Sequence, residues 1–370
     1  MPPHVALFIV AALLPAASPG GQVKVPLIHT TDLYHPPDDP DDHIDLATVF
    51  ALDEFDLRAV VFDTSHPRLD SHAPGAPVME PGFVPVAQLC FLTGRSVPCA
   101  SGLRAPFGSP VDKALDRPRQ EQAGVELLLR ALRDSPAPAI VTVLGSARQL
   151  MAAFNREPEL VKRKVRTVVL NAGPSDDDTT EWNVRLDVHA YVGLFRSGLP
   201  IDWYPCHSRL ISNSNTTDRN SFWRASHADL FRGLPPPLFA WFVHAFAGNQ
   251  RGDMLRALRE QGKGSAAQAI LSGRRNLWCT ASLALAAGRV LAKVPDGWRF
   301  ASASLVPAGT PVHLLALDPV TVTIRPDGHT KWELSSKPGK IRLFRRDPGP
   351  AHEPAMTEAL NALLRSLPVE

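Results

Sequence analysis

The chain has 370 residues, with 39 Lys and Arg against 37 Asp and Glu, so its formal net charge is +2. Apolar residues make up 44% and charged residues 21%, which excludes a wholly disordered chain, a coiled coil and a multi-span membrane protein. The lack of a basic excess also argues against a nucleic-acid partner, because binding to phosphates requires clustered Lys and Arg.

An apolar run at residues 5–14 opens the chain, and small residues and turn formers follow it as far as Gly21. The run is too short to span a bilayer as a helix. This layout predicts a signal peptide over residues 1–21, although no Lys or Arg precedes the run. The expected protein is secreted or periplasmic, has no membrane partner after cleavage, and forms one domain over residues 22–370. A buried first strand is the alternative interpretation of the run.

Apolar runs then alternate with helical patterns up to residue 205. The runs are apolar on both faces, as buried parallel strands are; they lie at 23–30, 57–62, 97–100, 140–144, 165–170 and 199–204. Helical patterns lie at 122–133, 146–155 and 186–197. The second of these helices starts at a capping box, Ser146-x-x-Gln149. The alternation predicts an α/β fold with a mainly parallel open sheet flanked by helices.

The C-terminal part has a different pattern. Residues 224–295 are expected to be mostly helical, and residues 354–367 to form a final helix. Between them, residues 312–344 predict a small region of antiparallel strands with turns at 326–328 and 338–339.

The four cysteines form no CxxC pair, which argues against a zinc ribbon or a thioredoxin-type site. In an exported protein disulfides are allowed, and Cys90 and Cys99 are the nearest pair in sequence. The sequence does not choose among the pairings of Cys90, Cys99, Cys206 and Cys279, and free thiols are the alternative.

The most informative stretch, residues 30–47, lies between the first expected strand and an apolar helix, at a carboxyl end where α/β sheets bind ligands. It holds six aspartates: Asp32, Asp38, Asp39, Asp41, Asp42 and Asp45. Two carboxylates about 4 Å apart repel by roughly 4 kcal/mol at an effective dielectric near 20. Converging aspartates therefore need a proton, solvent or a cation, and an all-oxygen set favours Ca²⁺ or Mg²⁺. An EF-hand does not fit the spacing, and a solvated acidic loop capping a helix is the alternative.

This stretch resembles the start of the inosine/uridine-preferring nucleoside hydrolase superfamily, where a strand ends in DxDPGxDD before a helix. Here Asp32 is followed, after an insertion, by Asp-Pro-Asp-Asp at 39–42. A second match is GSARQL at 145–150, where the family has GPLTNL. The third match is the most specific. The family has, in order, an apolar strand ending in a glycine pair, then EFN, DPxAA and SGLP. This chain has the same order, with an apolar run ending in NAG at 171–173, then EWN at 181–183, Asp187 and SGLP at 197–200.

The resemblance implies a nucleoside hydrolase-like fold, Ca²⁺ as cofactor and a small-molecule partner, either a nucleoside or a sugar. By position it implies metal ligands at Asp32, Asp39, Asp42 and the backbone carbonyl of Arg148. Asp41 or Asp32 would be the general base that activates water. Substrate contacts would come from Asn171, Glu181 and Asn183, and Trp182 could stack on a ring. A homo-oligomer is allowed but not defined by the sequence.

Two departures stand out. The family's later HD pair is replaced by NLWCTA at 276–281, and its Gly-Asn after the second strand by DTSH at 63–66. The leaving-group acid is therefore unassigned among His43, His66 and His207. The expected function is Ca²⁺-dependent hydrolysis of N-glycosidic bonds, with a non-catalytic sugar- or nucleoside-binding protein on the same fold as the alternative. A third hypothesis is an unrelated α/β hydrolase. The lack of a GxSxG elbow and of a P-loop in the sequence argues against it.

Overall fold

The computed structural model describes residues 23–34, 41–63, 80–175, 181–206, 218–246, 253–260 and 262–369. The expected signal peptide, Asp39 and two of the candidate acids, His66 and His207, lie outside these residues.

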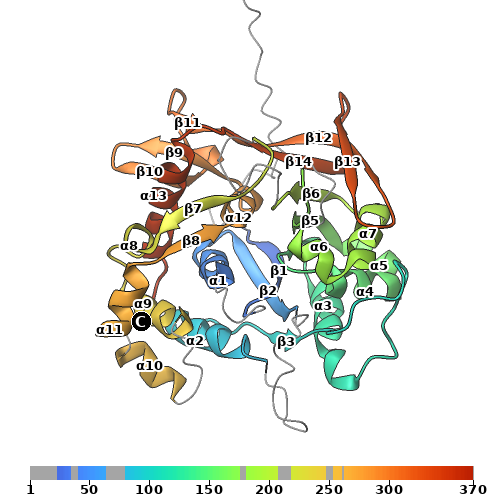
Figure 1. Ribbon diagram of the computed structural model, residues 1–370, viewed down its shortest axis with the longest axis horizontal. Coiled ribbons are helices and arrows are strands. Elements are labelled where there is room, and N and C mark those ends of the chain that lie inside the picture. Colours follow the sequence, from blue (N-terminus) through green and yellow to red (C-terminus); the bar gives the residue numbers. More distant parts are fainter. Residues whose placement is uncertain are drawn as a thin grey trace, which may run out of the picture.

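Within the described residues, a nine-stranded sheet runs through the molecule in the order β13-β12-β14-β6-β5-β4-β1-β2-β3 (Figure 1). The strands are β1 (Val25–Thr31), β2 (Phe55–Phe62), β3 (Cys99–Ser101), β4 (Ala139–Val143), β5 (Val165–Asn171), β6 (Ile201–Tyr204), β12 (Leu315–Ile324), β13 (Thr330–Leu334) and β14 (Ile341–Arg346). Neighbours from β3 to β14 pair in parallel, whereas β12 pairs antiparallel with both β14 and β13. The expected α/β fold with a mainly parallel sheet is confirmed.

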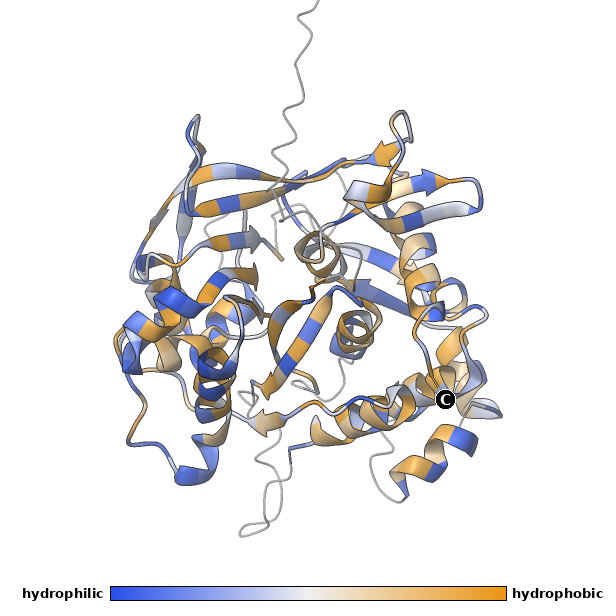
Figure 2. Cartoon of the chain, turned by 180° about the vertical axis from the view of Figure 1, so that it is seen from behind, coloured by the Kyte–Doolittle hydropathy of each residue, from blue (hydrophilic) through white to orange (hydrophobic). Residues whose placement is uncertain are grey.

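Successive side chains of the parallel strands enter opposite cores, as the two-residue period of a strand requires. Leu27 belongs to one core and Ile28 to the other. Figure 2 shows the central strands coloured as predominantly hydrophobic. The first core is closed by α1 (Asp41–Ala51), α2 (Phe83–Thr93), α8 (His227–Leu230), α9 (Pro236–Phe246), α12 (Thr280–Ala286) and α13 (His352–Arg365). The second is closed by α3 (Ala123–Asp134), α4 (Arg148–Arg156), α5 (Pro158–Lys164) and α7 (Val188–Arg196).

Two smaller sheets show that residues 224–295 are less helical than expected. One has the order β10-β9-β11 and the other pairs β7 with β8. Their strands are β7 (Trp223–Ser226), β8 (Arg274–Leu277), β9 (Arg289–Val294), β10 (Gly297–Ser302) and β11 (Val312–His313). The remaining helices are α6 (Trp182–Leu186), α10 (Met254–Glu260), α11 (Ser265–Leu271) and the 3₁₀ turns Arg119–Glu121 and Ala303–Leu305. The final helix and the turn at 326–328 are as predicted.

The capping box predicted at Ser146 and Gln149 is wrong. Helix α4 begins at Arg148 with Ala147 as its N-cap, and the Ser146 hydroxyl accepts the Arg148 N–H over 3.3 Å rather than the Gln149 N–H that a capping box requires. The Ser146 N–H donates to Asp63 instead, and the Gln149 amide exchanges hydrogen bonds with the backbone of Leu103. Long-range partners have therefore replaced the reciprocal bond that a capping box forms between the Gln149 side chain and the Ser146 N–H.

The four cysteines are free thiols, so the disulfide between Cys90 and Cys99 is not formed. In the described part of the chain, no helix combines the length and apolar character needed to cross a bilayer.

Candidate functional site

The carboxyl ends of β1, β2, β4, β5 and β6 lie next to one another, and the predicted site residues follow them. Backbone hydrogen bonds fix this alignment beyond the strands themselves. The Asp63 N–H donates to Thr31 O over 2.8 Å, and the Leu144 N–H to Thr30 O over 3.2 Å. The Cys206 N–H donates to Gly173 O over 3.0 Å. Five strand ends therefore form one edge, as expected for a ligand site in an open α/β sheet.

Four carboxylates gather at the ends of β1 and β2 and the start of α1. Asp32 is buried after β1 and is hydrogen-bonded to the side chain of Asp42, which is also buried. Asp63 and the half-buried Asp41 add negative charge around the pair. Burial is the main cause that raises the pKa of Asp32 well above its usual value, and the charge of Asp42 is the next. Without a cation, the cluster therefore favours a proton on this carboxyl.

Gly145, at the end of β4, has no room for a side chain here. A Cβ at this position would lie 2.8 Å from Asp32 Cβ and 2.8 Å from Asp63 Oδ2. The turn before α4 therefore packs directly against the two carboxylates.

One turn further along α1, the buried side chain of Asp45 is hydrogen-bonded to the thiol of Cys279. Cys279 immediately precedes α12, the helix start at which the family resemblance places the HD pair. Burial and the neighbouring carboxylates, Asp45 first, raise the pKa of this thiol well above its usual value. The start of α12 thus reaches the carboxylate cluster with a neutral group.

The side chains of Glu181 and Asn183 are held by backbone groups at the ends of β4 and β5. Glu181 is the N-cap of α6 and accepts N–H bonds from Asn183, Val184 and Gly173. The Asn183 amide donates to Leu144 O over 3.2 Å and to Asn171 O over 2.9 Å. Burial raises the pKa of Glu181, and its three backbone donors oppose this rise.

Buried groups link this pair to the carboxylates. The thiol of Cys206, which follows β6, is electrostatically affected by both Glu181 and Asp32. The Asn183 amide contacts Leu144 O, and Gly145, the next residue, packs against Asp32, so Asp32 and residues 181–183 lie at the same edge of the sheet.

Asn171 and Trp182 differ in their surroundings. Asn171 is fully buried at the end of β5, donates to Trp278 O over 3.2 Å and accepts from the Ser282 hydroxyl over 2.7 Å. Trp182 is 40% exposed, and the Arg185 guanidinium lies 5.8 Å from its ring centroid. The indole of Trp278 donates to Cys206 O, as a structural aromatic residue would.

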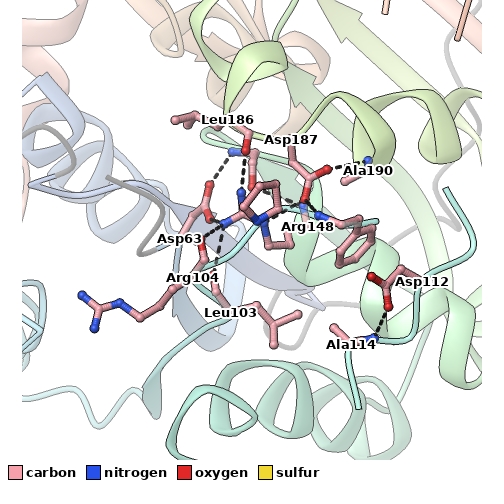
Figure 3. A network of polar contacts seen from close by, with 12 residues as sticks. Asp63, Leu103, Arg104, Asp112, Ala114, Arg148, Leu186, Asp187 and Ala190 are labelled. Atoms are coloured by element: carbon pink, nitrogen blue, oxygen red, sulfur yellow. Dashed lines mark hydrogen bonds and ion pairs between the residues drawn. The ribbon is translucent and has the colours of Figure 1, made fainter. Parts of the chain in front are cut away.

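Arg148, expected to offer its backbone carbonyl, is also a buried ionic centre (Figure 3). Its Nε lies 2.8 Å from Asp187 Oδ2 and its Nη1 3.6 Å from Asp63 Oδ1. Neither this network nor the role of Asp63 was foreseen. The only sequence signal was the position of Asp63 directly after an expected strand.

His43, the one candidate acid within the described residues, lies among aromatic rings. Its ring centroid is 4.3 Å from that of Tyr34 and 5.6 Å from that of Trp241. These contacts favour a structural role for His43.

The carboxylates fit a hard cation in charge and chemistry, since Asp32 and Asp42 are buried within hydrogen-bonding distance of each other. Nevertheless, the described residues contain no group of three or more His, Cys, Asp or Glu side chains arranged to hold a metal ion. Asp39, the third predicted carboxylate ligand, lies outside them.

No family model matches the chain. Curated relatives include the pyrimidine-specific ribonucleoside hydrolase RihA of Citrobacter koseri, 24% identical over 181 residues, covering 44% of this chain and 55% of the relative. RihA of Enterobacter sp. is 26% identical over 198 residues, covering 48% of this chain and 59% of the relative. The matches thus span little more than half the length of these relatives.

Solved structures share the fold over nearly the whole chain. The purine-preferring ribonucleoside hydrolase from Gardnerella vaginalis superposes with a TM-score of 0.52 at 15% identity, covering 92% of this chain and 99% of that one. The type III effector protein XopQ, complexed with adenosine diphosphate ribose, has a TM-score of 0.50 at 17% identity, covering 94% of each chain. These matches show that the chain has the fold of the nucleoside hydrolases, and the curated relatives add a sequence similarity over little more than half of their own length.

Proposed function

We propose that this protein hydrolyses the N-glycosidic bond of ribonucleosides or related ribosides, with Ca²⁺ bound at the carboxylate cluster. The observation that carries the proposal is the buried Asp32–Asp42 pair at the same sheet edge as Glu181 and Asn183. The named activity of the RihA relatives supports the same reaction class.

In this proposal Asp32, Asp42 and Asp39 hold the cation, together with the backbone carbonyl of Arg148. When bound, Ca²⁺ would lower the pKa of a water molecule and hold the sugar diol. Asp41, half-buried at the first position of α1, accepts the proton of the attacking water, with Asp32 as the other candidate base.

The sugar is oriented by groups that are already fixed. Glu181 and Asn183 are held by backbone hydrogen bonds, so little rotamer freedom is lost when they contact a hydroxyl. Asn171 supports Asn183 through its backbone carbonyl, and Trp182 offers an exposed ring face for a base.

Turnover of a nucleoside panel tests the proposal. Base and reducing-sugar release are measured with Ca²⁺ and with EDTA, for the wild type, Asp42→Ala and the exposed control Asp116→Asn. Ca²⁺-dependent release by the wild type and the control, but not by Asp42→Ala, is expected. No release by any of the three proteins, or equal release by all of them, would overturn it.

A second candidate function is sugar or nucleoside binding without catalysis. It is favoured by Cys279, whose thiol stands near the start of α12 where the family carries its HD pair. Calorimetric binding of ribose or a nucleoside in the presence of Ca²⁺, with no product formed over hours, would select this function over hydrolysis.

A further inference from the structure

A single buried guanidinium connects the two parts of the candidate site. Arg148 is fully buried at the first position of α4. Its side chain donates to four groups besides its contact with Asp63. These are Asp187 Oδ2 at 2.8 Å, Leu186 O at 2.6 Å, Arg104 O at 2.9 Å and Leu103 O at 3.2 Å.

On one side Arg148 faces the carboxylate cluster through Asp63. Asp63 Oδ1 lies 3.6 Å from the guanidinium, and Asp63 Oδ2 accepts the Ser146 N–H over 2.5 Å. Asp63 is itself close enough to Asp32 to act on its charge. Arg148 is therefore in ionic contact with a carboxylate that neighbours the proposed metal ligand and that the Ser146 N–H holds by a hydrogen bond.

On the other side Arg148 holds the segment that carries the proposed sugar-binding residues. Leu186 is the last residue of α6, the helix that starts at Trp182 and includes Asn183. Asp187 caps α7 through the Ala190 N–H and also accepts the Phe107 N–H, which ties in the loop after β3. Figure 3 shows Leu186 and Asp187 next to the guanidinium of Arg148, with Ala190 in contact with Asp187.

We infer that Arg148 is a positioning residue that sets the spacing between the carboxylate cluster and the sugar-binding helix α6. This inference rests on the proposed function and adds a residue to it. A planar fork with five N–H donors can serve several acceptors in fixed directions, whereas a lysine ammonium is a point charge. Because reacting groups must be held within a fraction of an ångström, loosening this centre lowers turnover more than it lowers metal binding.

The test compares Arg148→Lys with a matched control, Arg346→Lys. Arg346 is the other fully buried arginine in the described part of the chain, and it donates to Asn220 rather than to any site residue. Asp187→Asn is a second route to the same centre, should Arg148→Lys fail to fold. Each variant is measured for kcat and KM on the best nucleoside, for Ca²⁺ and ribose affinity by calorimetry, and for amide hydrogen exchange.

Arg148→Lys is expected to raise exchange at least ten-fold at residues 102–108 and 182–190 while β9 and β10 stay protected. Turnover and ribose affinity are expected to fall at least ten-fold, with Ca²⁺ affinity within three-fold of the wild type. Arg346→Lys is expected to keep the wild-type kcat.

Unchanged exchange in both segments, or unchanged kcat and ribose affinity in Arg148→Lys, would overturn the inference. An equal loss of kcat in Arg346→Lys would also overturn it, since any buried arginine would then have the same effect. If the wild type has no turnover, the proposed hydrolase activity is overturned separately. In that case amide hydrogen exchange and ribose affinity still test the positioning role of Arg148.

Discussion

A carboxylate buried beside another carboxylate destabilises a fold unless a proton or a cation lies between them. Asp32 and Asp42 are in this situation, with further negative charge from Asp63 and Asp41. The guanidinium of Arg148 lies near Asp63 but is shared with Asp187. The proposed cation would therefore act on stability as well as on chemistry.

Asp42→Asn is expected to abolish the response of thermal stability to Ca²⁺. A ligand at 100 times its Kd stabilises the native state by about 2.7 kcal/mol, which for the wild type means a rise of several degrees in Tm. In EDTA the variant is expected to melt no lower than the wild type, because the substitution removes one buried negative charge. Calorimetric scans with Ca²⁺ and with EDTA measure both effects.

Asp116→Asn, at an exposed position, serves as the control and keeps the wild-type response. A wild-type Tm that is the same in Ca²⁺ and EDTA would show that no stabilising cation binds.

Glu181→Gln separates the capping role of this residue from its proposed contact with sugar. The glutamate accepts three backbone N–H groups, so the variant is expected to lose about 1–2 kcal/mol of unfolding free energy. Ribose affinity is expected to fall at least ten-fold as well, measured by calorimetry. Ser226→Ala removes the N-cap of α8 and is expected to lose stability alone. Equal ribose affinities in the two variants would contradict a sugar contact by Glu181.

The sequence predicted site residues whose signal is local. Asp32 follows an apolar run, and Glu181 and Asn183 belong to a short motif with a recognisable order. The sequence match at 145–150 pointed to the backbone carbonyl of Arg148. Its side chain gave no such signal, because its partners come from segments about 40 to 85 positions away in the chain. The same limit explains why the capping box at Ser146 failed.

At the scale of elements, the central parallel strands were predictable because most of their residues are buried and each contains a short apolar run. Strands β7 and β8 were missed because they are four residues long and carry charged side chains. Helix α6, with five residues, is shorter than any periodic pattern can reveal. Its place is set by the Glu181 cap and by Arg148 rather than by an apolar stripe.

The β12–β13 hairpin supports the loop of residues 172–175, which directly follows β5. The Trp332 indole N–H donates to the carbonyl of Ser175, and the Arg219 guanidinium lies 5.2 Å from the Trp332 ring centroid. This hairpin is about 160 residues from the loop in sequence, so its influence on the site depends on the sheet order alone.

Trp332→Phe is expected to loosen this loop. The loss of one partly buried hydrogen bond lowers the unfolding free energy by about 1 kcal/mol. KM for the best nucleoside is expected to rise several-fold with little change in kcat, since the groups that act on water are on other strands. Trp298→Phe, in the small sheet, is the control and keeps the wild-type KM. A fall in kcat without a change in KM would contradict this division of roles.

At the scale of the whole molecule, two sets of buried groups oppose each other as pH changes. Burial lowers the pKa of His29 to about 3 and that of His352 to about 2, so their stabilising neutral forms are complete above pH 6.5 and lost as pH falls. Burial raises the pKa of Asp32 and Asp45 well above the usual value of 3.8. Their contribution is complete below that value and is lost as pH rises through the raised pKa.

The metal-free protein therefore loses stability on both sides of an intermediate pH. Each buried histidine changes the unfolding free energy by up to about 1.4 kcal/mol per pH unit between its folded and unfolded pKa. A cation at the carboxylates reduces only the loss of stability at high pH, because protons compete with the cation for Asp32 and Asp42 at lower pH.

Ca²⁺ is accordingly expected to raise Tm more at pH 8 than at pH 5, and to move the pH of maximum stability upward. Scans in Ca²⁺ and in EDTA at half-unit steps between pH 4.5 and 8.5 measure the difference at each pH. In Asp32→Asn the Tm difference between Ca²⁺ and EDTA is expected to become small and nearly independent of pH, because the buried carboxyl that binds both the proton and the cation is gone. The loss of stability at low pH that His29 and His352 cause is expected to remain in this variant. This distinguishes loss of the cation site from a general loss of fold. A Ca²⁺ effect of equal size at every pH would mean that the cation binds away from the buried carboxylates.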